Sequence, residues 1–140
     1  MKKLKRARVW VIIFQLFNGL SALAGGFGLI GDTTGRSLGM EIEMLQGTPF
    51  PNFLIPGIVL FTVNGLGNIA GFFATTRKHS RSGEIAALFG AIMMIWIISQ
   101  VAWLGYQSFL QPLYFSTGLI QLIAGWYLLK GVRKRLKPAG

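Results

Sequence analysis

Four long stretches of the chain are predominantly apolar and contain no charged residue. They cover about residues 9–30, 53–75, 85–106 and 109–129. A helix of roughly 20 residues, rising about 1.5 Å per residue, is long enough to cross the hydrocarbon core of a bilayer. The pattern therefore predicts an all-α integral membrane protein, a bundle of four transmembrane helices in one domain over residues 1–140.

The charged residues predict how these spans are oriented. All 14 Lys and Arg residues except Arg36 fall at residues 2–8, 77–81 and 130–137, whereas all acids except Glu84 fall at residues 31–52. Lys and Arg near the ends of spans stay in the cytoplasm. We therefore expect both termini and the loop 76–84 to be cytoplasmic, and residues 31–52 and 106–112 to be external.

The composition narrows the partners and the chemistry. A chain that is 52% hydrophobic and 13% charged is too apolar for a small soluble domain. Its net charge of +10 lies at the ends of the spans, so we expect membrane lipids, with anionic headgroups at the cytoplasmic face, and no nucleic acid. The absence of Cys excludes thiolate and disulfide chemistry, and the lone His79 lies in a basic loop, so neither a metal nor a cofactor is expected.

The first span has a second interpretation. A basic amino terminus, an apolar run and the sequence Ala22-Leu23-Ala24 are also typical of a cleavable secretory signal. The apolar run continues to Ile30, which is long for the core of a signal. We favour a retained span, and the alternative stays open.

The first external loop predicts a short surface helix. Leu38, Ile42 and Leu45 have helical spacing, with Glu41 off that face, which is typical of an amphipathic helix on the membrane surface. Gly47 would end it. Prolines then prevent a regular helix until the first turn of the second span, at Pro49, Pro51 and Pro56.

Residues of the second span reappear in the fourth at a constant offset. The matching residues are Phe61, Thr62, Ala70, Gly71, Phe72 and Phe73, against Phe115, Ser116, Ala124, Gly125, Trp126 and Tyr127. A duplication of two-helix units would explain this echo. The bias of membrane helices towards small and aromatic residues would explain it equally.

No Asp, Glu, Lys, Arg or His lies within a predicted span. Ionisable residues in the membrane mark proton relays and coupled transport, so their absence disfavours proton-coupled export. It also disfavours hydrolysis within the membrane, which needs a general base. We therefore expect no enzyme activity. An enzyme would have to use Asp32, Glu41 or Glu43 at the outer surface.

The spans contain a set of amides, which includes Gln15, Asn18, Asn64, Asn68, Gln100 and Gln121. They either join helices by hydrogen bonds or form a polar pocket for a ligand. Small residues repeat at a spacing of four in Ser21-x-x-x-Gly25, Ala22-x-x-x-Gly26 and Gly67-x-x-x-Gly71. This spacing indicates close helix packing, within the bundle or between protomers.

Aromatic and amide residues cluster around the last external turn, at Trp96, Gln100, Trp103, Tyr106, Phe109, Gln111, Pro112, Tyr114 and Phe115. They form either an interfacial belt that sets the height of the helices or an outward-facing site for a lipid or other amphiphile. The surface helix, folded over such a site, would bring Glu41 and Glu43 to its mouth. We expect no metal there, because residues two apart on a helix point to different sides.

Several longer patterns run through the chain. They are Gly-Thr-Pro-Phe-x-x-Phe-Leu-Ile-Pro-Gly at 47–57, Val-Asn-Gly-Leu-Gly-Asn at 63–68, Ile-Trp-Ile at 95–97 with Gln100, and Gly-Tyr-x-Ser-Phe-Leu-Gln-Pro-Leu-Tyr-Phe at 105–115. In these the chain resembles a widespread group of small bacterial membrane proteins with four spans and no assigned function. The resemblance implies the bacterial inner membrane and four helices, and it implies no catalytic residues.

These observations lead to one expected function and one alternative. We expect a small, non-enzymatic membrane protein that binds a lipid or other amphiphile at its outer leaflet, or that assists a larger membrane assembly, as a homo-oligomer or with a membrane-protein partner. A transporter of a neutral or amphiphilic solute is the alternative. The candidate ligand-binding residues are Glu41, Glu43, Pro49, Phe50, Asn64, Trp96, Gln100, Tyr106, Gln111 and Tyr114.

Overall fold

The long apolar stretches form long helices. A computed structural model describes residues 2–105 and 109–136, and within these it contains helices and no strand. The long elements are α1 (Lys2–Gly31), α2 (Leu54–Val59), the π-helix η3 (Leu60–Leu66), α3 (Gly67–Thr76), α4 (Ser82–Leu104) and α5 (Leu110–Leu136). Because α2, η3 and α3 follow one another without a break, they make a single span.

Four helices are therefore long and apolar enough to cross a membrane. Within the described residues, this confirms the predicted all-helical fold with four helices that could span a membrane. Both α1 and α5 also extend through basic clusters that the apolar pattern left outside. Lys and Arg are good helix formers, so a helix does not have to end where the hydrocarbon core ends.

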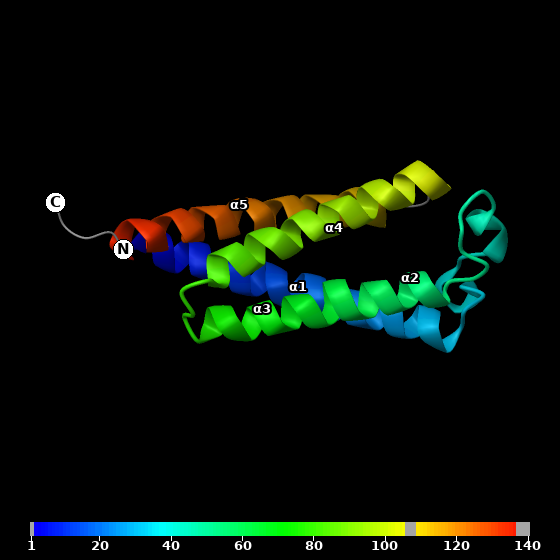
Figure 1. Cartoon of the computed structure of the whole chain (residues 1–140), viewed down its shortest axis with the longest axis horizontal. Coiled ribbons are helices and arrows are strands. Elements are labelled where there is room, and N and C mark those ends of the chain that lie inside the picture. Colours follow the sequence, from blue (N-terminus) through cyan, green and yellow to red (C-terminus); the bar gives the residue numbers. More distant parts are fainter. Residues whose placement is uncertain (1, 106–108, 137–140) are drawn as a thin grey trace.

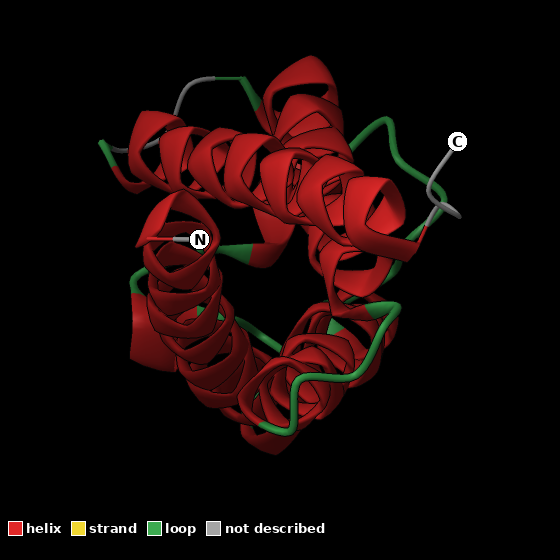
Figure 2. Cartoon of the chain, turned by 90° about the vertical axis from the view of Figure 1, so that its left-hand side faces the viewer, coloured by secondary structure: helices red, strands yellow, loops and turns green. Residues whose placement is uncertain are grey.

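The four spans lie roughly side by side (Figure 1). Their two ends differ in charge. The start of α1, the α3–α4 connection and the last turns of α5 lie at one end, here called the basic end. Figure 2 views the bundle from this side. Residues 32–53 lie at the other, the acidic-loop end. The side of the membrane that each end faces stays a prediction.

Residues 32–53 contain two single-turn 3-10 helices, η1 (Arg36–Leu38) and η2 (Ile42–Leu45), instead of one longer amphipathic helix. Gly39 separates them at φ 77°, a left-handed conformation that an α-helix cannot contain. Of the predicted apolar face, Leu45 is 6% exposed and Ile42 is 39% exposed. The side chain of Leu38 lies outside the description. Contact of this segment with a membrane surface stays a prediction.

Leu45 packs the loop against the bundle. It packs with Leu29 of α1 and with Phe53, which directly precedes α2. The N–H of Phe53 also donates to the carbonyl of Thr33 at 2.9 Å, so the two ends of the loop are joined. The loop is therefore a closed cap on the end of the bundle.

Asp32 orders the first turn of this cap. Its carboxylate accepts hydrogen bonds from the hydroxyl of Thr34 at 2.5 Å, from the N–H of Thr34 at 3.1 Å and from the N–H of Ser37 at 3.0 Å. The Thr34 hydroxyl, followed by the Ser37 N–H, holds the pKa of Asp32 below its ordinary value. The charged form of Asp32 is thus the form that organises this turn.

The second span begins as predicted but continues differently. Pro56 lies in the first turn of α2, where its missing N–H leaves no hydrogen bond unmade. The π-helix η3 was not predicted. Such wide turns are rare and frequently lie at functional sites, and no propensity rule locates them from sequence. The fourth span has no counterpart, since α5 is α-helical throughout.

Glycines allow the helices to approach closely. In α4 and α5, Gly83 faces Gly125 and Gly90 faces Gly118, so two pairs seven residues apart make the contact. A Cβ atom on Gly90 would lie 2.7 Å from the carbonyl oxygen of Gly118 and from the backbone nitrogen of Leu122. The backbones of α4 and α5 therefore touch directly.

The small residues of α1 serve a similar contact. Ala22 and Gly26 are buried, and a Cβ on Gly26 would lie 2.8 Å from the carbonyl oxygen of Gly57 in α2. The predicted pair Ala22-x-x-x-Gly26 therefore packs within the bundle. Ser21 and Gly25 line a cavity instead, which is described below.

The α4–α5 contact predicts that Gly90→Ala destabilises the protein by about 1–3 kcal/mol, because backbone must move to admit the methyl group. Gly31→Ala is the matched control, since nothing lies within 4 Å of its Cβ position. Thermal unfolding of the purified protein in detergent checks both. An unchanged midpoint for Gly90→Ala would contradict the direct backbone contact.

Candidate functional site

A buried amide at the middle of the bundle connects all four spans. Gln121 of α5 accepts a hydrogen bond from Asn18 Nδ2 of α1 at 2.8 Å. Its Nε2 donates to Asn68 Oδ1 of α3 at 2.8 Å and to the carbonyl of Ala86 in α4 at 3.0 Å. Thr117 adds a bond from its hydroxyl to Asn18 Oδ1 at 2.8 Å. We call Asn18, Asn68, Thr117 and Gln121 the amide network.

A second polar pair lies between α1 and α3, closer to the basic end. The hydroxyl of Thr75 is 2.8 Å from Gln15 Oε1 and 2.8 Å from the carbonyl of Gly71. The Gln15 amide lies against Gly71, where a Cβ would be 2.6 Å from its Nε2. The glycine thus makes room for the glutamine, and both Gln15 and Thr75 are fully buried.

For Gln15, Asn18, Asn68 and Gln121, the structure favours the interpretation of amides that join helices. Each interhelical hydrogen bond of this kind contributes about 0.6–2 kcal/mol. Their amides hydrogen-bond to one another, to the hydroxyls of Thr75 and Thr117, and to backbone carbonyls. Among the described residues, Nε2 of Gln15 has no partner. The network therefore ties the spans together at mid-bundle.

Asn64 in the π-helix differs from the other amides. Its side chain is 1% exposed, and in the described part of the chain neither Nδ2 nor Oδ1 has a hydrogen-bond partner. Its backbone carbonyl accepts from Asn68 Nδ2 at 2.8 Å. A buried amide without partners destabilises a protein by about 1–3 kcal/mol for each unsatisfied group.

A cavity of about 400 Å³ opens between the network and the acidic loop. It is bounded by α1, the loop, η3, α4 and α5. The residues that line it are Ser21, Ala22, Gly25, Leu29, Gly39, Met40, Met44, Leu60, Met93, Trp96, Ile97, Gln100, Leu110, Gln111 and Tyr114. Ser21 and Ala22 are one turn beyond Asn18 of the network, so the cavity ends near mid-bundle. We call it the outer cavity.

Four predicted site residues, Trp96, Gln100, Gln111 and Tyr114, line the outer cavity. The ring of Tyr114 stacks on Phe17 of α1, with 5.8 Å between ring centroids. The amide of Gln111 donates to the carbonyl of Gly105 at 3.4 Å.

The other predicted residues do not line the cavity. Glu41 and Glu43 are exposed, although they lie between the lining residues Met40 and Met44. Pro49 is exposed in the loop. Phe50 packs edge-on against Trp103 of α4, with 5.5 Å between centroids. Asn64 lies one turn below the lining residue Leu60, and Tyr106 lies outside the described residues.

Sequence reasoning missed several of the lining residues. The methionines at 40, 44 and 93 carry no motif, and they meet only because the loop folds back over the bundle. Ser21 and Gly25 were assigned to helix packing, yet they face the cavity. Thr75 and Thr117 were also missed in the buried hydrogen bonds. Threonine hydroxyls near amides in a membrane span are the signal that would have found them.

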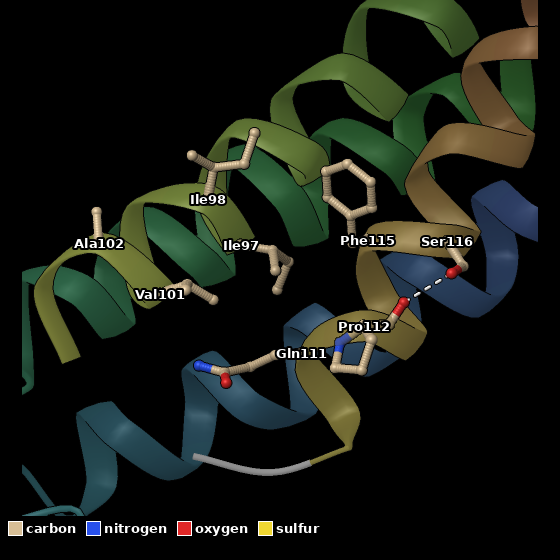
Figure 3. Close-up of a pocket in the computed structure, with 8 residues that line it drawn as sticks. All are labelled: Ile97, Ile98, Val101, Ala102, Gln111, Pro112, Phe115 and Ser116. Carbon is tan, nitrogen blue, oxygen red and sulfur yellow. Dashed lines mark hydrogen bonds between the residues drawn. The ribbon is translucent and has the colours of Figure 1, made fainter. Parts of the chain in front are cut away.

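A second hollow of about 500 Å³ lies on the outside of α4 and α5 (Figure 3). Its lining is mainly apolar, from Ile97, Ile98, Val101, Ala102, Gln111, Pro112, Phe115 and Ser116. Ile98 and Val101 are exposed, so this groove faces the surroundings of the bundle. Ile97 and Gln111 line both hollows and separate them.

The described residues hold no group of three or more His, Asp or Glu that would bind a metal ion. Glu84 forms an ion pair with Arg133, 4.0 Å apart at the exposed basic end. The outer cavity thus offers neutral hydrogen-bonding groups and apolar walls, and none of its lining residues is charged.

In comparisons with protein-family models, with curated proteins and with solved structures, none matches this chain.

The network predicts a contrast between two amide substitutions. Gln121→Leu leaves Asn18 and Asn68 without their partner and lowers stability by about 1–3 kcal/mol for each stranded group. Asn64→Leu removes an amide that has no partner, so its stability is unchanged or higher. Thermal unfolding in detergent compares the two. Equal losses would mean that the side chain of Asn64 has a stabilising partner.

Proposed function

We propose that this protein is a non-enzymatic membrane protein that binds a lipid or other amphiphile in the outer cavity. The observation that carries the proposal is an apolar cavity with a few neutral polar groups at the acidic-loop end of a four-span bundle. Sites for small molecules typically have this combination of apolar walls and a small number of polar groups.

The way the second span is arranged also supports lipid binding. Among the described residues, α2 packs on α1 and η3 and has no close backbone contact with α4 or α5. The second and third spans are joined by contacts of α4 with α3 and η3, nearer the basic end. We propose that a ligand dissolved in the membrane reaches the cavity sideways, between α2 and α4, where no close backbone contact joins the two helices.

The amide network favours binding over transport. A solute crossing the bundle would have to pass Gln121, whose amide is hydrogen-bonded to α1, α3 and α4. Breaking several buried hydrogen bonds in each cycle would oppose passage. We therefore rank the transporter of a neutral solute second, and help to a larger membrane assembly remains part of the first proposal.

We also propose that the acidic-loop end faces outward from a bacterial inner membrane and that the basic end faces the cytoplasm. Basic clusters then meet anionic headgroups there, each cation contributing about 1 kcal/mol near the surface. Because the chain has no Cys, single cysteines report this orientation. A membrane-impermeant maleimide labels Ser37→Cys in intact cells and labels Ser80→Cys only after permeabilisation. The reverse pattern would invert the topology.

Filling the cavity tests the binding proposal. Gly25→Leu places a larger side chain in it, and the nearest neighbour of the new Cβ is the flexible side chain of Leu60, at 3.2 Å. Ala24→Leu, exposed on the same helix, is the matched control. Native mass spectrometry of the protein in mild detergent counts the co-purified lipid. We expect Gly25→Leu to retain about tenfold less than wild type, equivalent to about 1.4 kcal/mol.

The control should retain as much lipid as wild type. Equal retention by Gly25→Leu, Ala24→Leu and wild type would show that the bound lipid is not in the outer cavity. That result would overturn the proposal.

A further inference from the structure

We infer, resting on the proposed function, that the ligand of the outer cavity is an uncharged amphiphile with a single chain and a hydroxyl-bearing head, such as a monoacylglycerol. The inference names the class of ligand from the charge, size and polarity of the walls.

The charge of the cavity excludes a charged head. None of its lining residues is Lys, Arg, His, Asp or Glu. A phosphate or carboxylate is bound in proteins by charge-assisted hydrogen bonds, typically from Arg or Lys. Burying such a group without a charged partner is strongly unfavourable.

The charge of the acidic loop is a second reason to expect an uncharged head. The acidic loop carries the carboxylates of Asp32, Glu41 and Glu43 and only one cation, Arg36. Two of these acids lie between the lining residues Met40 and Met44. The loop over this end of the cavity therefore has a net negative charge, which repels anionic headgroups.

The size of the cavity limits the chain. At about 400 Å³ it lies near the lower end of the range for small-molecule sites, about 300–1,000 Å³. A single chain suits this volume better than the two chains of a phospholipid. Met93, in the deeper part of the cavity, is flexible and polarisable, so it adapts to an apolar chain of variable shape.

The polar residues set the direction of the ligand. Gln100 and Gln111 lie near the facing ends of α4 and α5, at the acidic-loop end, whereas Met93 lies two turns deeper along α4. Amides and the phenol of Tyr114 both donate and accept hydrogen bonds, which matches hydroxyl groups. The head thus lies towards the acidic loop, and the chain points towards the amide network.

Three probes with the same 14-carbon chain test this. Delipidated protein in mild detergent is incubated with monomyristoylglycerol, with myristoyl lysophosphatidylcholine or with myristoyl lysophosphatidylglycerol, and native mass spectrometry measures retention. We expect the uncharged probe to be retained at least about tenfold more than either charged one. Gly25→Leu should abolish this retention and Ala24→Leu should not.

The head is tested separately with Gln100→Leu, which should lower retention of monomyristoylglycerol several-fold. Gln46→Leu, in the exposed loop, is the matched control.

Each outcome has one meaning. Equal or stronger retention of a charged probe, lost in Gly25→Leu, would overturn this inference and leave the proposed function standing. No Gly25-dependent retention of any probe, together with co-purified lipid that Gly25→Leu also fails to displace, would overturn both. Retention that Gln100→Leu leaves unchanged would overturn the assignment of the head.

Discussion

The structure depends on the rule that an amide buried in a membrane protein needs a hydrogen-bond partner. Gln121 meets it with three bonds that reach α1, α3 and α4. Lipid tails are as apolar as the outer faces of the helices, so no hydrophobic force specifies which span lies beside which. A residue that contacts three neighbours supplies that specification, because other arrangements would leave several amides unpaired.

The glycine contacts complement the network. Where Gly83 and Gly90 meet Gly125 and Gly118, α4 and α5 touch along their backbones, and Gly26 brings α1 against α2 in the same manner. These contacts form two close pairs, α4 with α5 and α1 with the second span. The pairs are joined at mid-bundle by hydrogen bonds, while α2 and α4 have no close backbone contact at the acidic-loop end. The outer cavity is the space that this arrangement leaves.

The same arrangement connects the fold to the proposed function. The network lies at the inner end of the cavity, and Gly39, Met40 and Met44 of the loop line its other end. In the proposed function, the ligand enters sideways between α2 and α4. A cavity with its base near mid-bundle and such an entrance would suit a ligand that never leaves the bilayer. Asn64, one turn from the lining residue Leu60, is the amide for which neither side-chain atom has a hydrogen-bond partner among the described residues.

The sequence by itself determined the four spans, the concentration of basic charge at one end and the absence of Asp, Glu, Lys, Arg and His within the spans. These properties depend on single residues and their distance along one helix, because lipid acts on each span separately. It also identified Trp96, Gln100, Gln111 and Tyr114 as one group, since they lie on two helices joined by a short turn. Only the tertiary structure decided the partners of the amides, the π-helix, the two-turn form of the loop, and the cavity that Ser21, Gly25 and three methionines help to line. Those features depend on contacts between residues as far apart as Asn18 and Gln121, and spacing along the chain carries no information about which distant helices meet.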